Sequence, residues 1–208
     1  MDMKRELTEK EAENFLEKEG FKVVKRALIS SEEEIKTIEK QIKFPWVMKV
    51  SSSRLSHKAK LGGVMLGIDN QMKAQEAFDK LSKIHGFEEC VIQETASGEE
   101  IIIGIKKTAE FGSVLMFGKG GSRVQEEKDV SFRAVPLASK DIREMIAETR
   151  ISKILDEERA SMKEIIKNIK LAEKLAKKYP NIIEFDINPL FVSQKSAKVA
   201  DARIIFGE

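Results

Sequence analysis

The segment IIEFDINPLFV, residues 182–192, constrains the fold of this chain more than any other. Apolar and polar residues alternate along it, which is typical of a β-strand with one face in a hydrophobic core. Three side chains that carry oxygen, Glu184, Asp186 and Asn188, fall on one face, and isoleucine and phenylalanine fall on the other. Such a strand has to cover a core on one side and present a polar surface on the other.

The segment KVADARIIF, residues 198–206, follows this strand after a polar turn and predicts an antiparallel hairpin. A tight hairpin places Asp201 roughly opposite Asn188. Carboxylate and amide oxygens in one cluster are hard ligands that suit Mg²⁺ rather than zinc. The pattern is equally compatible with the solvated face of an ordinary edge hairpin, although Pro189 favours a shaped strand end.

The remaining periodicities predict an α+β fold. Capping boxes begin helices at Thr8 and Ser31, and helical spacing covers 70–84 and 161–179, with a short helix near Ser139. Strands are expected at 21–29, 44–50, 62–68, 89–95, 99–107, 114–121, 130–137, 182–192 and 198–206. Neighbouring strands occur as often as strand–helix alternation, which argues against a doubly wound parallel sheet. We expect one domain over 1–208 with two lobes, about 1–95 and about 96–208.

Composition excludes several classes of protein. The net charge is +2, from 37 basic and 35 acidic residues, which is unlike a dedicated nucleic-acid binder. Because lysines on the expected helices alternate with glutamates, we expect no nucleic-acid partner. The single cysteine, Cys90, suits a reducing compartment, and the chain has neither a signal-peptide pattern nor an apolar run of 18 residues. We therefore expect a cytoplasmic protein without a membrane partner.

Lys49 interrupts the apolar segment FPWVMKV near its end. A lysine in such a strand can be an edge residue whose ammonium group reaches solvent. It can also project an ammonium group into a cleft and bind a phosphate. The strand pattern alone favours the edge interpretation.

Two glycine-rich segments could approach an anion closely. In FGKGG, Gly118, Gly120 and Gly121 leave backbone N–H groups accessible, although the spacing is neither a Walker A motif nor a Rossmann fingerprint. In SSSRLSHKAKLGGVML, basic residues precede Gly62 and Gly63. An oxygen cluster, a strand lysine and two such loops together are typical of a nucleoside triphosphate site between two lobes.

In their order, the motifs PWVMKV, SHKAKLGGV, VIQE, GEEIIIGI, FGSVLMFGKGG, KDVSFRAVPL, EFDINPLFV and VADARI resemble the β subunit of ADP-forming acyl-CoA synthetases, such as acetyl-CoA synthetase. These enzymes are related to succinyl-CoA synthetase and have an ATP-grasp fold. The resemblance covers nearly the whole chain. It implies two lobes with the nucleotide in the cleft between them, and ATP or ADP as substrate with Mg²⁺ as cofactor.

The resemblance also implies roles for individual residues. Lys49 matches the lysine that contacts nucleotide phosphates, and Gln93 and Glu94 match the strand that lines the adenine pocket. Asn188 and Asp201 match Mg²⁺ ligands. Asp186 matches the acidic residue of the same motif and is the third expected metal residue. The remaining matches are Glu100, without an assigned role, and the loop glycines Gly62, Gly63, Gly118, Gly120 and Gly121.

His57 stands in the segment whose histidine, by resemblance, can carry a phosphoryl group to ADP. An imidazole nitrogen is a suitable nucleophile, and the flanking cations would stabilise the phosphate. The alternative is a solvated loop histidine. The resemblance implies an α partner that carries the CoA-binding and phosphohistidine domains, in an α2β2 complex. We therefore expect half of an enzyme, which needs that partner for full turnover.

Several positions depart from the family pattern. Lys60 replaces a carboxylate, Thr108 replaces an aspartate, Lys119 makes FGLGG into FGKGG, and Gln125 replaces a glutamate. These departures keep open a diverged nucleotide-binding subunit with a regulatory or scaffolding role. A further alternative is a stand-alone ATP-grasp ligase, which would need an acceptor-binding domain of its own, for which 208 residues leave little room.

Overall fold

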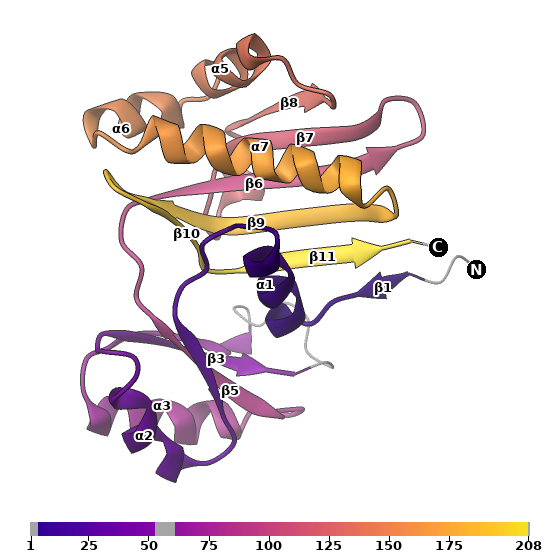
Figure 1. Cartoon of the computed structure of the whole chain (residues 1–208). Coiled ribbons are helices and arrows are strands. Elements are labelled where there is room, and N and C mark those ends of the chain that lie inside the picture. The colour runs from indigo at the N-terminus through magenta and orange to yellow at the C-terminus, as the bar shows by residue number, and fades with distance from the viewer. Residues whose placement is uncertain (1–3, 53–60, 208) are drawn as a thin grey trace. The chain divides into compact units, whose positions relative to one another are not determined.

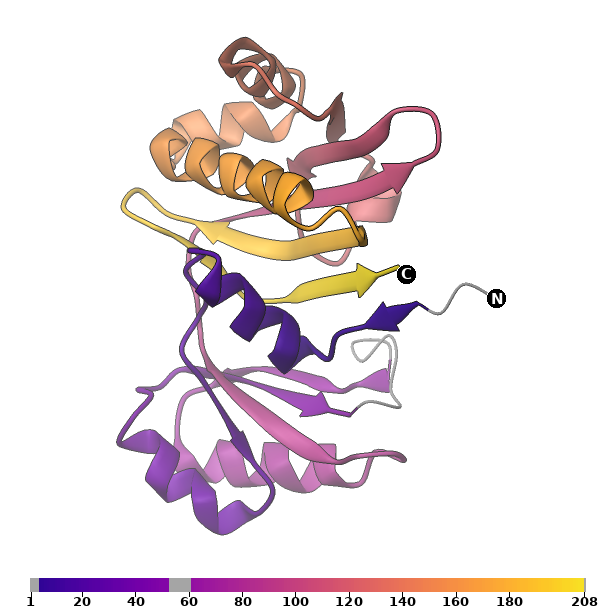
Figure 2. The ribbon, with the colours of Figure 1, turned by 45° about the vertical axis from the view of Figure 1, so that its right-hand side comes forward.

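The computed structural model describes residues 4–52 and 61–207. The chain divides into two compact units, of which one comprises Val24–Ala96 and the other comprises Met1–Val23 together with Ser97–Glu208. Each unit has an antiparallel sheet with helices beside it (Figures 1 and 2). Each also has its own hydrophobic core. Antiparallel sheets with helices on one face make an α+β architecture, so the expected fold class is confirmed.

The smaller unit has a four-stranded sheet in the order β2-β5-β3-β4. These strands are β2 (Arg26–Ile29), β5 (Glu89–Glu94), β3 (Trp46–Ser51) and β4 (Val64–Ile68). One face packs on a 3₁₀ turn (Glu32–Glu34), α2 (Ile35–Glu39) and α3 (Gln71–Ser82). The Trp46 indole N–H donates to the Ile42 carbonyl oxygen at 3.0 Å, which satisfies the largest buried side chain.

Sequence spacing explains α3. Asn70 accepts a hydrogen bond from the Lys73 N–H at 2.9 Å and caps the first turn. Ala74, Ala77 and Leu81 recur at helical spacing and are buried against the sheet. The polar side of the same helix stays in solvent.

The larger unit has a seven-stranded sheet in the order β1-β11-β9-β6-β7-β8, with β10 paired to β9. Its strands are β1 (Arg5–Glu6), β6 (Glu99–Thr108), β7 (Gly112–Lys119), β8 (Val130–Ala134), β9 (Ile182–Val192), β10 (Ala197–Val199) and β11 (Ala202–Phe206). Four helices pack on one face of it: α1 (Glu9–Lys18), α5 (Ser139–Ala147), α6 (Ile151–Glu157) and α7 (Met162–Lys178). A single turn, α4 (Val124–Glu127), follows the FGKGG loop.

The core of the larger unit lies between this sheet and its helices. Phe185 and Ile187 of β9 are fully buried with Leu16 of α1 and Ile169 of α7. Truncation of such a phenylalanine to alanine typically costs about 3–5 kcal/mol of unfolding free energy. The alternation along β9 therefore has the meaning expected from sequence, with one face in the core and the other polar.

The N-terminal segment differs from the expected lobe of about 1–95. Arg5 and Glu6 of β1 pair with Phe206 and Ile205 of β11, and Leu16 of α1 is buried in the core of the larger unit. Residues 4–23 therefore belong with the second part of the chain. A two-residue strand carries too little periodicity to be recognised, which is why the sequence did not indicate this pairing.

Several expected boundaries were wrong. The segment 198–206 forms two short strands, because the chain turns at Ala200 and Asp201. Within 21–29 only β2 is regular strand, and α6 was not expected. The expected strand 182–192 is confirmed as β9, and its ladder with β6 shifts register around Pro189. Within the described residues, no helix has both the length and the apolar character needed to cross a bilayer.

Cys90 offers a probe of the smaller unit. The thiol is fully buried on β5, and burial raises its pKa to about 12. Because thiolate is the reactive form, we expect almost no reaction with a disulfide reagent at pH 8 in the folded chain, and complete reaction in guanidinium chloride. Rapid modification under native conditions would mean that the β3–β5 ladder opens readily.

Candidate functional site

One row of facing residues crosses three strands of the larger sheet. Gly104 of β6 lies opposite Asp186 of β9, and Asp186 lies opposite Arg203 of β11. Facing residues of an antiparallel pair point to the same side of the sheet. Because their neighbours Phe185 and Ile204 point into the helix-covered core, this row lies on the opposite face.

Gly104 makes room for the Asp186 carboxyl group. A Cβ atom at Gly104 would lie 2.5 Å from Asp186 Oδ1. Burial, assisted by the nearby Glu184 carboxylate, raises the pKa of Asp186 to about 6. The positive charges of Arg203 and Lys106 oppose this rise. Asp186 is thus a desolvated carboxyl group, and an additional cation nearby would stabilise its ionised form.

Arg203 is held by two other carboxylates. Its Nε donates to Glu6 Oε1 at 2.7 Å, and its Nη1 donates to Glu184 Oε1 at 2.6 Å. The two acceptors come from β1 and β9, so the guanidinium group joins three strands. These partners raise the pKa of Arg203, with Glu6 as the largest cause.

Asn188 and Gly121 form a reciprocal pair of hydrogen bonds. The Gly121 N–H donates to Asn188 Oδ1 at 2.7 Å, and Asn188 Nδ2 donates to the Gly121 carbonyl oxygen at 3.2 Å. The carboxamide thus binds both polar groups of one residue in the FGKGG loop. This pairing fixes which end of the Asn188 side chain presents oxygen.

Glu100 lies on the other side of the same loop. Its carbonyl oxygen accepts the Gly120 N–H at 2.8 Å. A Cβ atom at Gly121 would overlap Glu100 Oε2, and one at Gly120 would overlap the Ile101 backbone. The loop glycines are therefore required for a close approach of the loop to β6.

Asp201 adjoins Asn188 as the hairpin predicts. The Asn188 N–H donates to the Asp201 carbonyl oxygen at 3.1 Å, at the turn between β10 and β11. Among the described residues no group of three or more His, Cys, Asp or Glu forms a metal cage. Mg²⁺ often uses only one or two protein oxygens and takes the rest from water and phosphate. Asn188 and Asp201, with Asp186 nearby, fit such a site by their chemistry.

In the smaller unit, Lys49 and Gln93 lie on one face. Lys49 of β3 is opposite Val91, and Gln93 of β5 is opposite Val47, while Met48 points into the core. Lys49 is 8% exposed and Gln93 is 2% exposed. Because β3 is an interior strand, the interpretation of Lys49 as an edge residue is wrong. A lysine with so little exposure has little access to bulk water.

Glu94 and the glycine pair have local structural contacts. Glu94 Oε1 accepts the Lys25 N–H at 3.0 Å, and the Glu94 N–H donates to the Lys25 carbonyl oxygen at 2.9 Å. The Gly63 carbonyl oxygen accepts the Val50 N–H at 2.8 Å, and Gly62 has φ +70°. His57 lies outside the described residues.

The structure divides the expected residues between the two units. The cluster of the larger unit comprises Glu100, Gly118, Gly120, Gly121, Asp186, Asn188 and Asp201. The smaller unit holds Lys49, Gly62, Gly63, Gln93 and Glu94, of which Lys49 and Gln93 share one face of the sheet.

Sequence reasoning missed two residues that position the larger cluster. Gly104 was indicated only by its place inside an isoleucine-rich strand, where a glycine often marks close approach. Asp129 caps α6, since its carboxylate accepts the N–H groups of Arg150 at 2.7 Å and Ile151 at 2.8 Å. Its carbonyl oxygen also accepts the Lys119 N–H at 2.9 Å, which ties the loop to that helix.

The ATP-grasp domain family matches residues 2–206. The β subunit of acetate–CoA ligase (ADP-forming) I from Pyrococcus furiosus is 34% identical over 97% of this chain and 92% of its own length. The chain belongs to this ATP-grasp family. Acetate–CoA ligase (ADP-forming) II from Archaeoglobus fulgidus is 39% identical over 97% of this chain. The chain spans about 30% of the length of that relative.

A solved structure supports the same grouping. It is the dinucleotide-forming acetyl-coenzyme A synthetase 1 of Ca. Korarchaeum cryptofilum, in complex with coenzyme A and Ca-AMPCP. That chain superposes with a TM-score of 0.87 at 32% identity, over 97% of this chain and 93% of its own. The expected ATP-grasp fold is confirmed.

Two glycines with positive φ allow a matched test of the loop. Gly112 (φ +64°) has open space at the Cβ position, whereas Gly121 (φ +96°) faces Glu100. We expect Gly112→Ala to lower the unfolding free energy by about 1–2 kcal/mol through backbone strain alone. Gly121→Ala should lower it further, by about 1–3 kcal/mol, because Glu100 and Asn188 lose their positions. Chemical denaturation measures both; equal losses would contradict the close approach seen here.

Proposed function

We propose that this chain is the nucleotide-binding β subunit of an ADP-forming acyl-CoA synthetase. The reaction is acyl-CoA + ADP + phosphate ⇌ acid + CoA + ATP. The observation that carries the proposal is the clasp of Asn188 on Gly121 beside Asp201, in a chain that aligns with nearly all of the Pyrococcus β subunit. The face of the larger sheet that the helices leave uncovered is polar. It combines a glycine loop with hard oxygen ligands, and this combination suits a chain of phosphates.

The residues of the larger unit would receive the phosphates and their metal. Asn188 Oδ1 and the Asp201 carboxylate would hold Mg²⁺, with Asp186 as a nearby negative charge. When bound, Mg²⁺ neutralises phosphate charge and lowers the barrier to phosphoryl transfer. The Gly118, Gly120 and Gly121 segment would offer backbone N–H groups, and Glu100 would support that loop. A relative with bound Mg-AMPPCP, the Korarchaeum enzyme, supports the choice of metal and nucleotide.

The residues of the smaller unit would bind the rest of the nucleotide. The Lys49 ammonium would contact phosphate oxygens, and burial at 8% exposure would strengthen that interaction. Gln93 and Glu94 would line the adenine pocket. Gly62 and Gly63 would permit a close approach of the segment that follows His57.

His57 would carry the phosphoryl group. In the ATP-forming direction, the bond between phosphorus and an imidazole nitrogen breaks, and a β-phosphate oxygen of ADP forms the new P–O bond. The histidine leaves as neutral imidazole or takes up a proton from solvent. The Korarchaeum enzyme has been solved with its phosphohistidine segment pointing towards the nucleotide-binding site, which supports this route.

A partner would supply the acyl and CoA chemistry. The Pyrococcus relative is named a β subunit, which supports an α partner with the CoA-binding and phosphohistidine domains. We propose an α2β2 complex. We also propose a cytoplasmic location, because the one cysteine is free and buried, as in proteins of reducing compartments.

The decisive experiment is the intact mass of the purified chain after incubation with Mg·ATP, with and without a candidate α subunit. We expect a gain of one phosphoryl group that is labile to acid. His57→Ala should abolish it, and His85→Ala is the matched control because it removes the only other histidine. Nucleotide binding without any label, even with the partner present, would favour the regulatory subunit instead.

A second prediction tests the role of Lys49. Lys49→Met keeps the length of the side chain and removes its charge. We expect the dissociation constant for Mg·ADP to rise about 10- to 100-fold, which corresponds to the loss of a charged hydrogen bond. Titration calorimetry measures it, with Lys80→Met on α3 as an exposed control. An unchanged affinity would remove Lys49 from the phosphate site.

A further inference from the structure

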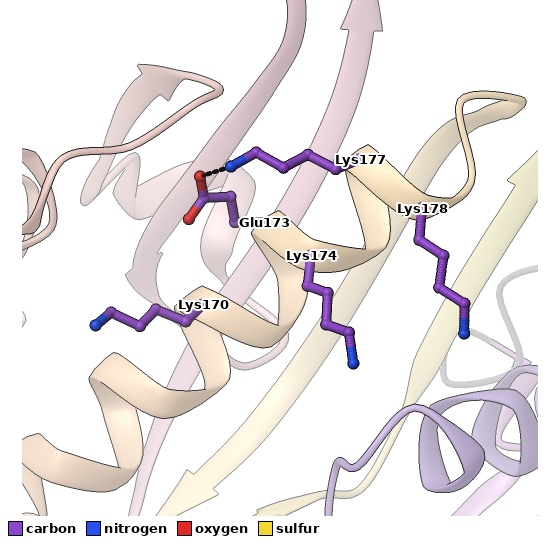
Figure 3. Close-up of a pocket in the computed structure, with 5 residues that line it drawn as sticks. All are labelled: Lys170, Glu173, Lys174, Lys177 and Lys178. Atoms are coloured by element: carbon purple, nitrogen blue, oxygen red, sulfur yellow. Dashed lines mark hydrogen bonds and ion pairs between the residues drawn. The ribbon is translucent and has the colours of Figure 1, made fainter.

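Every exposed residue of α7 is a lysine. The helix has 17 residues, and the partly and fully buried ones include all of its apolar side chains. We call its exposed face the α7 lysine stripe; it consists of Lys163, Lys167, Lys170, Lys174, Lys177 and Lys178. Figure 3 shows the last four of these side chains spreading from the outer side of the helix.

The stripe is straight and long. Successive lysines are separated by four, three, four, three and one residues, so at about 100° per residue they occupy an arc of about 100°. From Lys163 to Lys178 the stripe extends about 22 Å along the axis. The helix also carries two glutamates next to lysines of the stripe: Glu173, which is 9% exposed, and Glu164, which is partly exposed. The exposed residues of α7 themselves carry charge of one sign.

Among the described residues, the direct ion pairs of the stripe lie at its C-terminal end, although Lys170 and Lys174 also interact electrostatically with Glu173 and Glu19. Lys177 pairs with Glu173 at 2.6 Å, and Lys178 pairs with Glu19 at 2.6 Å. The other four lysines have no acidic side chain within 4 Å among residues 4–52 and 61–207. Like charges three or four residues apart destabilise a helix by about 0.2–0.5 kcal/mol per pair. The arrangement thus costs stability and is not explained by the fold.

A lysine-rich composition does not explain it either. The exposed residues of α1 are Lys10, Glu11, Asn14, Glu17 and Lys18, and those of α3 are Met72, Lys73, Glu76, Asp79 and Lys80. Both helices mix the two signs, as the alternation of lysine and glutamate predicts for the helices of this chain. For α7 that prediction is wrong, because neither of its glutamates is among its exposed residues.

The chemistry of the stripe favours phosphate over protein as its partner. Protein interfaces are depleted in lysine and enriched in aromatic residues and arginine, whereas α7 exposes neither. Lysine binds phosphates as a point charge and needs no defined geometry. We propose that the α7 lysine stripe binds the phosphate backbone of a nucleic acid without reading its sequence. About 22 Å corresponds to six or seven phosphates of one strand.

The test is fluorescence anisotropy with a labelled 20-nucleotide oligothymidylate and a labelled 20-base-pair duplex. If the four unpaired lysines each neutralise one phosphate, log K should fall with log [salt] with a slope of about −3 to −4. Affinity would then drop about 100-fold between 50 and 200 mM salt. Two duplexes of unrelated sequence should bind equally.

The variant replaces Lys163, Lys167, Lys170 and Lys174 with glutamine, which preserves helix propensity. We expect at least a 30-fold loss of affinity at 50 mM salt and a slope close to zero. The matched control replaces Lys10, Lys18, Lys80 and Lys140 with glutamine; it changes net charge equally and should keep most of the binding. Equal losses in both variants would mean that only net charge matters and would overturn the proposal.

Two further measurements keep the result interpretable. The thermal midpoint of the stripe variant should equal or exceed that of the natural sequence, because repulsion is removed. The second measurement is competition: a peptide with glutamates at the same alternating four- and three-residue spacing is added to the complex of the chain with the oligonucleotide. If it displaces the oligonucleotide at equal or lower charge concentration, the stripe is a docking site for an acidic protein and the nucleic-acid proposal fails.

Discussion

The pairing of the Asn188 carboxamide with the Gly121 backbone is the interaction on which the larger unit's candidate site depends. It uses both ends of one side chain to hold one residue of a loop that leaves the sheet between β7 and β8. Among the described residues, the other backbone hydrogen bonds of the FGKGG segment go to β6, to β8 and to Asp129. With this pairing, a potential metal ligand, Asn188, is hydrogen-bonded directly to a potential phosphate-binding loop. A ligand that fixes the orientation of the Asn188 side chain would therefore also fix the position of Gly121.

The sheet supplies the frame for this pairing. β9 places Phe185 and Ile187 in the core and Asp186 and Asn188 on the opposite face, so burial of the apolar residues fixes where the polar ones point. A register slip by one residue would exchange the two faces and expose the core. The hydrophobic effect in the helix-covered layer therefore specifies the position of the polar row. Asp186 tolerates its desolvated place because Gly104 leaves space and Arg203 and Lys106 supply positive charge.

The sequence was sufficient wherever a short-range pattern determines the structure. Alternation predicted β9 within its bounds, the spacing of Ala74, Ala77 and Leu81 predicted α3, and the capping box at Thr8 predicted α1. The adjacency of Asp201 and Asn188 followed from hairpin geometry and is confirmed. These elements carry their own signal, because each depends on residues within one strand, helix or hairpin.

The sequence was insufficient where the structure depends on contacts between distant segments. The pairing of β1 with β11 joins positions about 200 residues apart, and no pattern within the N-terminal segment reveals it. The role of Asp129 depends on the N-terminus of α6, a helix that local spacing did not indicate. No sequence pattern around Asn188 predicts that its carboxamide pairs with Gly121, because the two residues are 67 positions apart.

The two chemical surfaces of the larger unit lie on opposite sides of one sheet. The core strands place Asp186 and Arg203 on the face of the sheet away from the helices. On the opposite face lies α7 (Figure 2), with its apolar side buried against the sheet and its lysines exposed. A phosphate chain bound to the polar row and a polyanion bound to the α7 lysine stripe would thus be separated by the full thickness of sheet and helix, about 10 Å between the layers plus the helix itself. Screening at physiological salt reduces exposed charge interactions over about 8 Å. The two sites would therefore act almost independently, and a change in the stripe leaves the electrostatics of Asp186 and Asn188 nearly unaltered.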